Sequence, residues 1–293
     1  MTIRGNRSGF KKSAWLATED REEGGAGVWK KTMTFPLTGS GAPAGESHPA
    51  PYPANLAKLD GLDLMARYRA ARRGGNFFDG LAIGQRVVFL LTDIAGARAE
   101  ARALAVDVQA AFRQCAPDLF GPPGANESEA IATLAYELNR SLIEAACGVH
   151  FTPAFLGCFS LALGILTYHN AGLLAVFHDA EGARILQSSG IPLGLFTHIT
   201  YEPEVLAFEP RARLLLVTKA VVESPRGASE FGAKRIERLL ANVKADSASQ
   251  ICETALQQAY AFGNRPWTRF YDLLYHGKHL GNDDLTAVAL VRD

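Results

Sequence analysis

Short polar side chains flank one apolar run in this sequence of 293 residues. A glycine pair and the amide of Asn76 come before the run, and the carboxylate of Asp93 comes after it. The run itself, Val87 to Leu91, is apolar at every position, as in a buried strand. An amide and a carboxylate at one sheet edge present the oxygen ligands that hard divalent cations prefer. The spacing therefore predicts a cation site at the end of this strand.

The order of these motifs resembles the start of the catalytic domain of metal-dependent Ser/Thr protein phosphatases, the PP2C-like superfamily, in its bacterial SpoIIE/RsbU-type branch. Members read GGDFYD and then GDVSGHG, where this chain reads GGNFFD and TDIAGAR. Asn76 thus stands at the position of the first metal-binding Asp of the family. Thr92 stands where the family has the Gly before its second Asp.

Later segments resemble further motifs of the same family. LTYHNAG, from Leu166 to Gly172, is similar to LxYxNAGH, with Leu173 in place of the His. GIPLG at 190–194 matches GxPLG, LLLVTKA at 214–220 resembles LLLYTDG, and NDDLT at 282–286 resembles DDxT. Each segment alone is typical of a glycine turn between strands. Together with the two earlier motifs, these four segments in the family's order point to its fold.

The resemblance implies hydrolysis of phosphoserine or phosphothreonine by two Mn²⁺ or Mg²⁺ ions that activate a bridging water. Carried over by position, the implied metal ligands are Asn76, Asp93, Lys219, Asp283 and the backbone carbonyl of Ile94. Asp79 and Asp284 are possible supporting carboxylates. One amide, one ammonium and two carboxylates carry a net charge of −1, where four carboxylates would carry −4.

The two substitutions differ in their expected effect on metal binding. The amide of Asn76 keeps a carbonyl oxygen, whereas the ammonium of Lys219 has no lone pair and repels a divalent cation. Aimed inward, Lys219 would form salt bridges with Asp93 and Asp283; otherwise it extends from the strand end into solvent. Asp93 and Asp283 have their own alternative as turn formers and caps.

These features predict a SpoIIE-type phosphatase homologue of bacterial signalling whose activity is impaired or lost. We expect weak or absent Mn or Mg binding, and a phosphoprotein or regulatory protein as the partner. The rival hypothesis is an active Mn/Mg-dependent Ser/Thr phosphatase that uses one metal at Asp93 and Asp283 or recruits Asp79 or Asp284. A third is a purely structural scaffold.

The expected fold is α+β, a four-layer αββα sandwich of two antiparallel sheets flanked by helices. Alternating and apolar runs predict strands, and three- and four-residue apolar spacing predicts helices. The predicted strands are 62–69, 87–91, 155–163, 165–169, 173–178, 213–218 and 285–291, and those at 87–91, 161–168 and 214–217 should be central and buried. The predicted helices are 96–114, 233–242, 247–262 and one that follows Asn126 as its cap. The helix after Asn126 packs Ile131, Leu134, Leu138, Leu142 and Ala145 on one side.

Composition limits the compartment and the partners. A formal net charge of zero gives no electrostatic footprint for nucleic acid or an anionic membrane. Four widely spaced cysteines in apolar surroundings suit buried thiols in a reducing, cytoplasmic compartment. Cys147 and His150 have the spacing of zinc ligands, but no second pair of ligands lies nearby in the sequence, which argues against a zinc site. The apolar stretch from Phe151 to Phe177 is broken into pieces too short for a membrane span.

The chain divides into a Gly, Ser and Pro-rich segment or linker at 1–54 and a domain at 55–293. Within the domain, 264–281 is rich in aromatic residues. Aromatic residues at helical spacing usually pack onto a core, and the other interpretation is a lid or partner-docking element. The sequence leaves the oligomeric state open.

Overall fold

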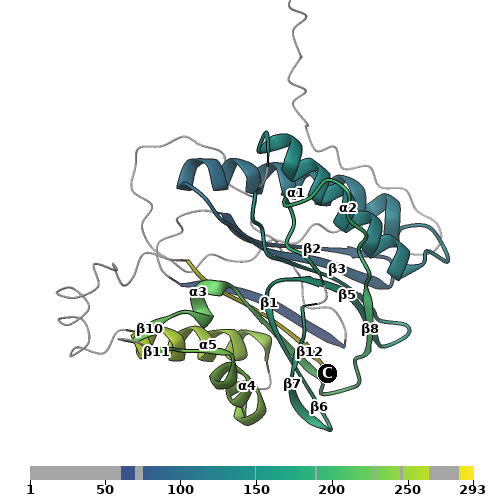
Figure 1. Ribbon diagram of the computed structural model, residues 1–293. Coiled ribbons are helices and arrows are strands. Elements are labelled where there is room, and N and C mark those ends of the chain that lie inside the picture. The colour runs from purple at the N-terminus through teal and green to yellow at the C-terminus, as the bar shows by residue number, and fades with distance from the viewer. Residues whose placement is uncertain are drawn as a thin grey trace, which may run out of the picture.

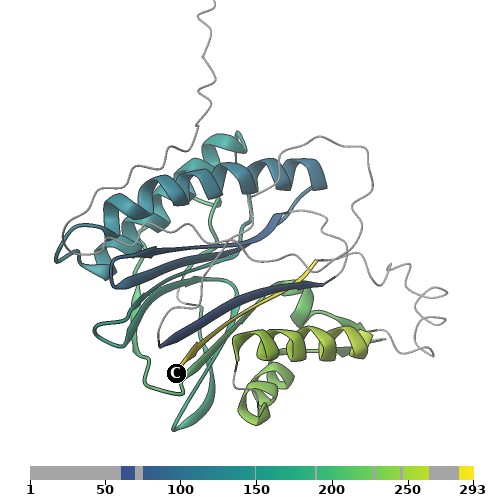
Figure 2. The same cartoon turned by 180° about the vertical axis from the view of Figure 1, so that it is seen from behind.

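Two five-stranded antiparallel sheets stack face to face, and a pair of helices covers the outer face of each (Figure 1). The view from behind shows the same four layers (Figure 2). The computed structural model describes residues 61–69, 75–148, 150–188, 190–226, 229–244, 247–263 and 284–293. The predicted αββα sandwich is confirmed. The segments 1–54 and 264–281 lie outside the described residues.

The first sheet has the order β2-β3-β4-β5-β8. Its strands are β2 (Gly75–Ile83), β3 (Arg86–Ile94), β4 (Ala154–Ser160), β5 (Ile165–Ala171) and β8 (Glu204–Ala207). Helices α1 (Arg98–Phe120) and α2 (Glu127–Ala145) cover its outer face. The side chain of Asn126 caps α2 by accepting hydrogen bonds from the backbone N–H groups of Ser128 and Glu129, as its position before the apolar helix predicts.

The second sheet has the order β1-β12-β9-β6-β7. Its strands are β1 (Leu62–Arg69), β12 (Leu285–Arg292), β9 (Arg213–Val217), β6 (Leu174–Asp179) and β7 (Gly182–Leu186). Helices α4 (Ala233–Asn242) and α5 (Ala248–Gly263) cover its outer face. The short helix α3 (Lys219–Val222) follows β9, and a small hairpin of β10 (Pro225–Arg226) and β11 (Ser229–Glu230) follows α3.

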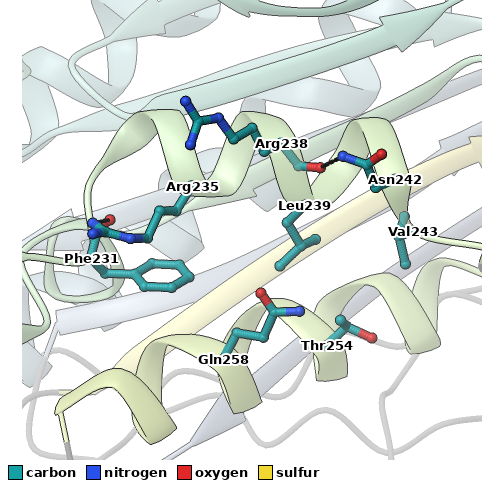
Figure 3. Close-up of a pocket in the computed structure, with 8 residues that line it drawn as sticks. All are labelled: Phe231, Arg235, Arg238, Leu239, Asn242, Val243, Thr254 and Gln258. Carbon is teal, nitrogen blue, oxygen red and sulfur yellow. Dashed lines mark hydrogen bonds between the residues drawn. The ribbon is translucent and has the colours of Figure 1, made fainter.

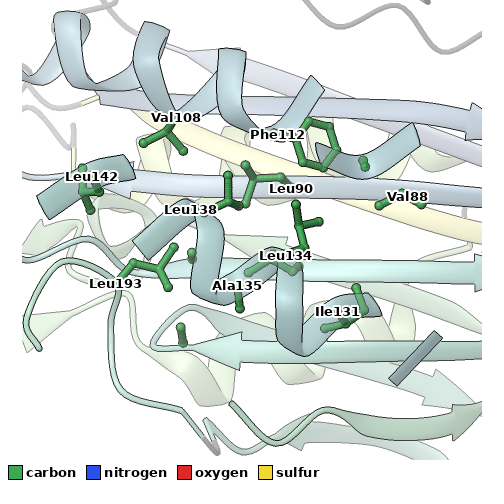
Figure 4. Close-up of a cluster of buried hydrophobic side chains, with 14 of the residues drawn as sticks. Val88, Leu90, Val108, Phe112, Ile131, Leu134, Ala135, Leu138, Leu142 and Leu193 are labelled. Carbon is green, nitrogen blue, oxygen red and sulfur yellow. The ribbon is translucent and has the colours of Figure 1, made fainter. Parts of the chain in front are cut away.

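Strand alternation divides the core into layers. In β3, Val87, Phe89 and Leu91 face the second sheet, whereas Val88 and Leu90 face the helices. Figure 4 shows the helix-side cluster, in which Val88 and Leu90 lie beneath side chains of α1 and α2. The β3 run is therefore apolar throughout because both of its faces are buried.

Three local predictions are wrong. The strand predicted at 155–163 ends at Ser160, and the central strand predicted at 161–168 begins only at Ile165, because the chain turns over 161–164, where Gly164 has φ +65° and Leu163 is 66% exposed. Ala145, placed on the buried face of α2, is exposed. Cys147 is exposed and Cys115 only partly buried, whereas Cys158 and Cys252 are buried thiols. None of the helices in the described ranges is long and apolar enough to cross a membrane.

Candidate functional site

Asn76 and Asp93 lie directly opposite each other on β2 and β3. The next pair on the same face, Phe78 and Leu91, belongs to the cluster between the two sheets. Because side chains alternate along a strand, Asn76 and Asp93 point the same way, toward the second sheet. Asn76, next to the glycine pair in sequence, and the strand-end carboxylate are thus brought together at one end of the sandwich.

The second sheet meets this pair at two points. The amide nitrogen Nδ2 of Asn76 donates to the backbone carbonyl of Asp284, at 2.9 Å. The carboxylate oxygen Oδ2 of Asp93 accepts a hydrogen bond from the backbone N–H of Lys219, at 3.1 Å. These contacts gather Asn76, Asp93, Lys219 and Asp284 although they are far apart in sequence.

The Lys219 side chain extends into solvent. Its ammonium lies 3.3 Å from Oε1 of Glu223, one turn further along, and 62% of the side chain is exposed. Lys219 is the first residue of α3, after Thr218 with ψ 161°. Of the two predicted directions for this ammonium, the structure thus has the outward one.

Asp79 is not part of this arrangement. It lies three residues beyond Asn76 on β2, so its side chain is on the opposite face, toward α1. It is fully buried, and it accepts hydrogen bonds from Arg113 at 2.6 and 3.2 Å and from Gln109 at 2.9 Å. The suggestion that Asp79 supports a metal is corrected: its carboxylate fixes helix α1 to β2.

Residues 83–293 match the family model of stage II sporulation protein E, SpoIIE. The chain belongs to the SpoIIE family. This is a family of PP2C-like, metal-dependent Ser/Thr phosphatases that act in bacterial signalling. The matched region includes Asp93, Lys219 and Asp284, and Asn76 precedes it.

Solved structures with the SpoIIE-type fold resemble the chain at low sequence identity. The RsbU and RsbW domains of a Mycobacterium tuberculosis protein share 22% identity, with a TM-score of 0.61 over 79% of this chain and 61% of that one. The SiaA-PP2C domain of Pseudomonas aeruginosa shares 15%, with a TM-score of 0.62 over 78% and 86%. The PP2C phosphatase domain of Bacillus subtilis SpoIIE, with a fragment of its regulatory domain, shares 14% sequence identity. Its TM-score is 0.61, over 79% of this chain and 62% of that one. This chain covers less than two thirds of the length of the Mycobacterium tuberculosis and Bacillus subtilis structures.

The donors described at this site do not fit a pair of hard cations. Such a pair is normally held by several carboxylates. Among the gathered residues Asn76, Asp93, Lys219 and Asp284, two carry carboxylates, Asp93 and Asp284, fewer than the several that a pair of hard cations needs, and Asn76 turns its nitrogen, a donor, toward the Asp284 carbonyl. Within the described ranges, no group of three or more His, Cys, Asp or Glu side chains could hold a metal ion.

The other positions named by the SpoIIE pattern are placed as follows. Asp283 lies outside the described residues, so its ligand role stays a prediction, as does that of the Ile94 carbonyl. Ile94 ends β3, with its side chain buried on the helix side. Thr92 is fully buried and paired with Phe77, also on the helix side, so its extra bulk relative to Gly is directed away from the second sheet. Leu173 is buried at 4% exposure.

Asn139 of α2, which the sequence did not single out, holds the GIPLG loop of this SpoIIE domain. Its Oδ1 accepts from the backbone N–H of Gly194 at 2.8 Å, and its Nδ2 donates to the carbonyl of Phe196 at 2.9 Å. Asn139 is 1% exposed. A polar residue on the apolar face of α2 is the sequence signal that could have identified it.

His169 lies beneath the same loop. It is 1% exposed, and its ring meets the ring of Tyr201 edge-on with centroids 5.1 Å apart. Gly190 packs so closely on the imidazole that a Cβ there would collide with it. Burial lowers the pKa of His169, and the backbone carbonyl of Glu202 and the carboxylate of Glu204 oppose this in part.

We expect His169 to make the protein less stable as the pH falls below its ordinary pKa of 6.5. In that range the unfolded chain binds a proton that the folded chain excludes, whereas at higher pH the imidazole is neutral in both states. Melting temperatures from about pH 7.5 to about pH 5.5 should fall less for His169→Phe than for wild type. His198→Phe, at an exposed position, is the control and should match wild type. Equal losses in all three proteins would contradict this assignment.

A groove of about 330 Å³ lies between α4 and α5 (Figure 3). Phe231 and Leu239 contribute its apolar surface, and Thr254 and Gln258 rise toward it from α5. The groove is on the outer face of the second sheet, whereas Asn76 and Asp93 point between the sheets. It is therefore separate from the candidate site of this SpoIIE domain.

Proposed function

We propose that this SpoIIE-family protein has impaired or lost metal-dependent phosphatase activity and acts by binding a partner protein. The observation that carries the proposal is the direction of Lys219. Its ammonium pairs with Glu223 in solvent, at a position where the resemblance to the family calls for a metal-ligating Asp. One ligand of the dinuclear centre is thereby lost, and the Asn76 amide weakens a second.

The partner that we propose is a phosphoprotein or regulatory protein of a bacterial signalling pathway. Membership of a family of signalling phosphatases supports this class of partner. We place the protein in the cytoplasm, a reducing compartment that suits its four free thiols. We also place the domain boundary near residue 55, shortly before β1 begins at Leu62, and treat 1–54 as a segment or linker.

The second candidate is an active Mn/Mg-dependent phosphatase with an altered metal site. The gathering of Asn76, Asp93 and Asp284 at one end of the sandwich favours it, since it brings oxygen atoms from both sheets together. Asp283 would complete such a site.

A calorimetric titration with MnCl₂ near neutral pH tests the proposal. We expect wild type to show no tight binding of two ions, because the −1 charge of the four positions cannot offset two divalent cations. Asp93→Ala is the control that removes the described carboxylate, and its titration should resemble that of wild type. Two tightly bound Mn²⁺ ions per chain, lost in Asp93→Ala, would contradict the proposal and support the active phosphatase.

A further inference from the structure

Three hydrogen bonds cross between the sheets at the end that carries the candidate site. Asn76 Nδ2 donates to the carbonyl of Asp284, the Lys219 N–H donates to Oδ2 of Asp93, and the Phe78 N–H donates to the Tyr68 hydroxyl at 3.1 Å. Beyond this end, the two sheets are packed through an apolar cluster that includes Phe89, Phe155 and Leu216.

In the first two of these bonds, a nitrogen donor meets an oxygen between a strand of the first sheet and a residue beside a strand of the second, because Asp284 precedes β12 and Lys219 begins α3 after β9. An aspartate at 76 would instead direct a carboxylate at the Asp284 carbonyl, with the Asp93 carboxylate directly across the strand pair. Three oxygen acceptors would then meet where the Asn76 amide now supplies an N–H group, an arrangement that favours a cation between them. The amide of Asn76 supplies the proton and removes that need.

Lys219 contributes through its backbone. The peptide N–H of Lys219 makes the bond to Asp93, so the contact does not use the Lys219 side chain. That side chain pairs with Glu223 in solvent. The extended Thr218 and the first turn of α3 aim this N–H at the first sheet. The type of side chain at 219 can thus change without loss of the contact.

We propose that the Asn76–Asp284 and Asp93–Lys219 hydrogen bonds form an inter-sheet clasp that takes the place of divalent cations in joining the two sheets. The clasp extends the proposed function, since it rests on the loss of the metal pair. It explains how the site keeps its arrangement with a donor set that does not fit metal.

Melting temperatures of the full chain, in EDTA and in MnCl₂, test the clasp. Wild type should melt within about 1 °C in the two solutions, a shift that corresponds to well under 1 kcal/mol for a domain of this size. Asn76→Asp should melt about 4–8 °C lower in EDTA, because it loses a part-buried donor and gains a charge opposite Asp93. Mn²⁺ should restore part of this loss.

Asn139→Asp is the matched control. Asn139 is a buried amide whose Nδ2, like that of the half-buried Asn76, donates to a backbone carbonyl, but it lies on α2, away from the carboxylate of Asp93. It should melt lower in EDTA and gain nothing from Mn²⁺. A wild type that loses more than about 2 °C in EDTA, an unaffected Asn76→Asp, or an equal response of both variants to Mn²⁺ would overturn the clasp.

Lys219→Pro and Lys219→Ala form a second, independent pair. Both remove the ammonium, but proline also removes the N–H that bonds to Asp93. Proline suits the first helical position, and the preceding Thr218, at ψ 161°, already has the conformation that proline requires. Lys219→Pro should melt about 2–4 °C below Lys219→Ala. Equal melting temperatures would count against the clasp.

The outcomes separate the clasp from the proposed function. A wild type that binds two Mn²⁺ ions, and therefore melts higher in MnCl₂ than in EDTA, contradicts both the lost metal site and the replacement of cations by the clasp. A wild type that binds no Mn²⁺, with an Asn76→Asp variant of unchanged stability, contradicts the clasp alone.

Discussion

The double variant Asn76→Asp/Lys219→Asp should hydrolyse p-nitrophenyl phosphate in the presence of Mn²⁺ at least about 10²-fold faster than wild type. Bound metal activates water and screens phosphate charge, which together supply several kcal/mol to the transition state, and about 1.4 kcal/mol corresponds to a factor of ten. Each change returns a carboxylate to a position where the family has one. Together they move the charge of the four positions from −1 to −4.

The single variants should contribute unequally. Lys219→Asp removes an ammonium and adds a ligand, a change of two charge units, whereas Asn76→Asp changes one. Neither alone should approach the double variant, because both ions are needed to activate the shared water and groups acting as a unit are not additive.

Rates with and without Mn²⁺ for wild type, both singles and the double decide the matter. If wild type already turns over with Mn²⁺ and the double gains nothing, the proposed loss of activity is wrong. If no variant turns over although the double binds Mn²⁺, the loss extends to other positions that depart from the family pattern, such as Thr92 and Leu173.

Arg113→Met should cost about 3–5 kcal/mol of unfolding free energy, the usual effect of leaving a buried charge without its partner. The carboxylate of Asp79 is 1% exposed, and the guanidinium of Arg113 contacts it through two nitrogens, at 2.6 and 3.2 Å. Gln109 and the N–H of Gly80 would remain as donors, but neither carries charge. Urea denaturation measures the loss.

The double variant Asp79→Leu/Arg113→Met separates the buried charge from other effects of the substitution. Replacing both partners by apolar side chains leaves no unpaired charge, so it should recover most of the stability. A single variant that loses less than about 1 kcal/mol, or a double variant no more stable than the single, would contradict the role given to this ion pair.

Several elements could be predicted because their signals are local. The run at 87–91 is apolar on both alternating faces, and α4 has its predicted bounds, Ala233–Asn242. Asp79 was misassigned although the information was present: three residues along a strand reverse the face, so it cannot share a site with Asn76. The turn at 161–164 was missed because apolar Leu161 and Leu163 hide it, and Gly164 alone marks it.

Other features depend on contacts between distant segments. The directions predicted for Lys219 are inward, to Asp93 and Asp283, or outward into solvent. It points outward, and its ammonium reaches Glu223 because a short helix begins at 219. The bond between Asn139 and the loop spans 55 residues. The sequence indicates a buried polar residue there, but its partner is set by how α2 packs over the first sheet.

The strand order has a consequence for the sequence of events during synthesis. The first sheet uses strands between residues 75 and 207, so all of its pairings are available once that stretch has been made. The second sheet joins the earliest strand to the latest, since β1 pairs with β12 and β12 separates β1 from β9. Pairings over such long sequence separations form slowly. During synthesis, Asn76 and Asp93 should therefore be in place before their partners Asp284 and Lys219 have been made. A chain that stops before Leu285 would leave β1 with no strand beside it in the described sheet.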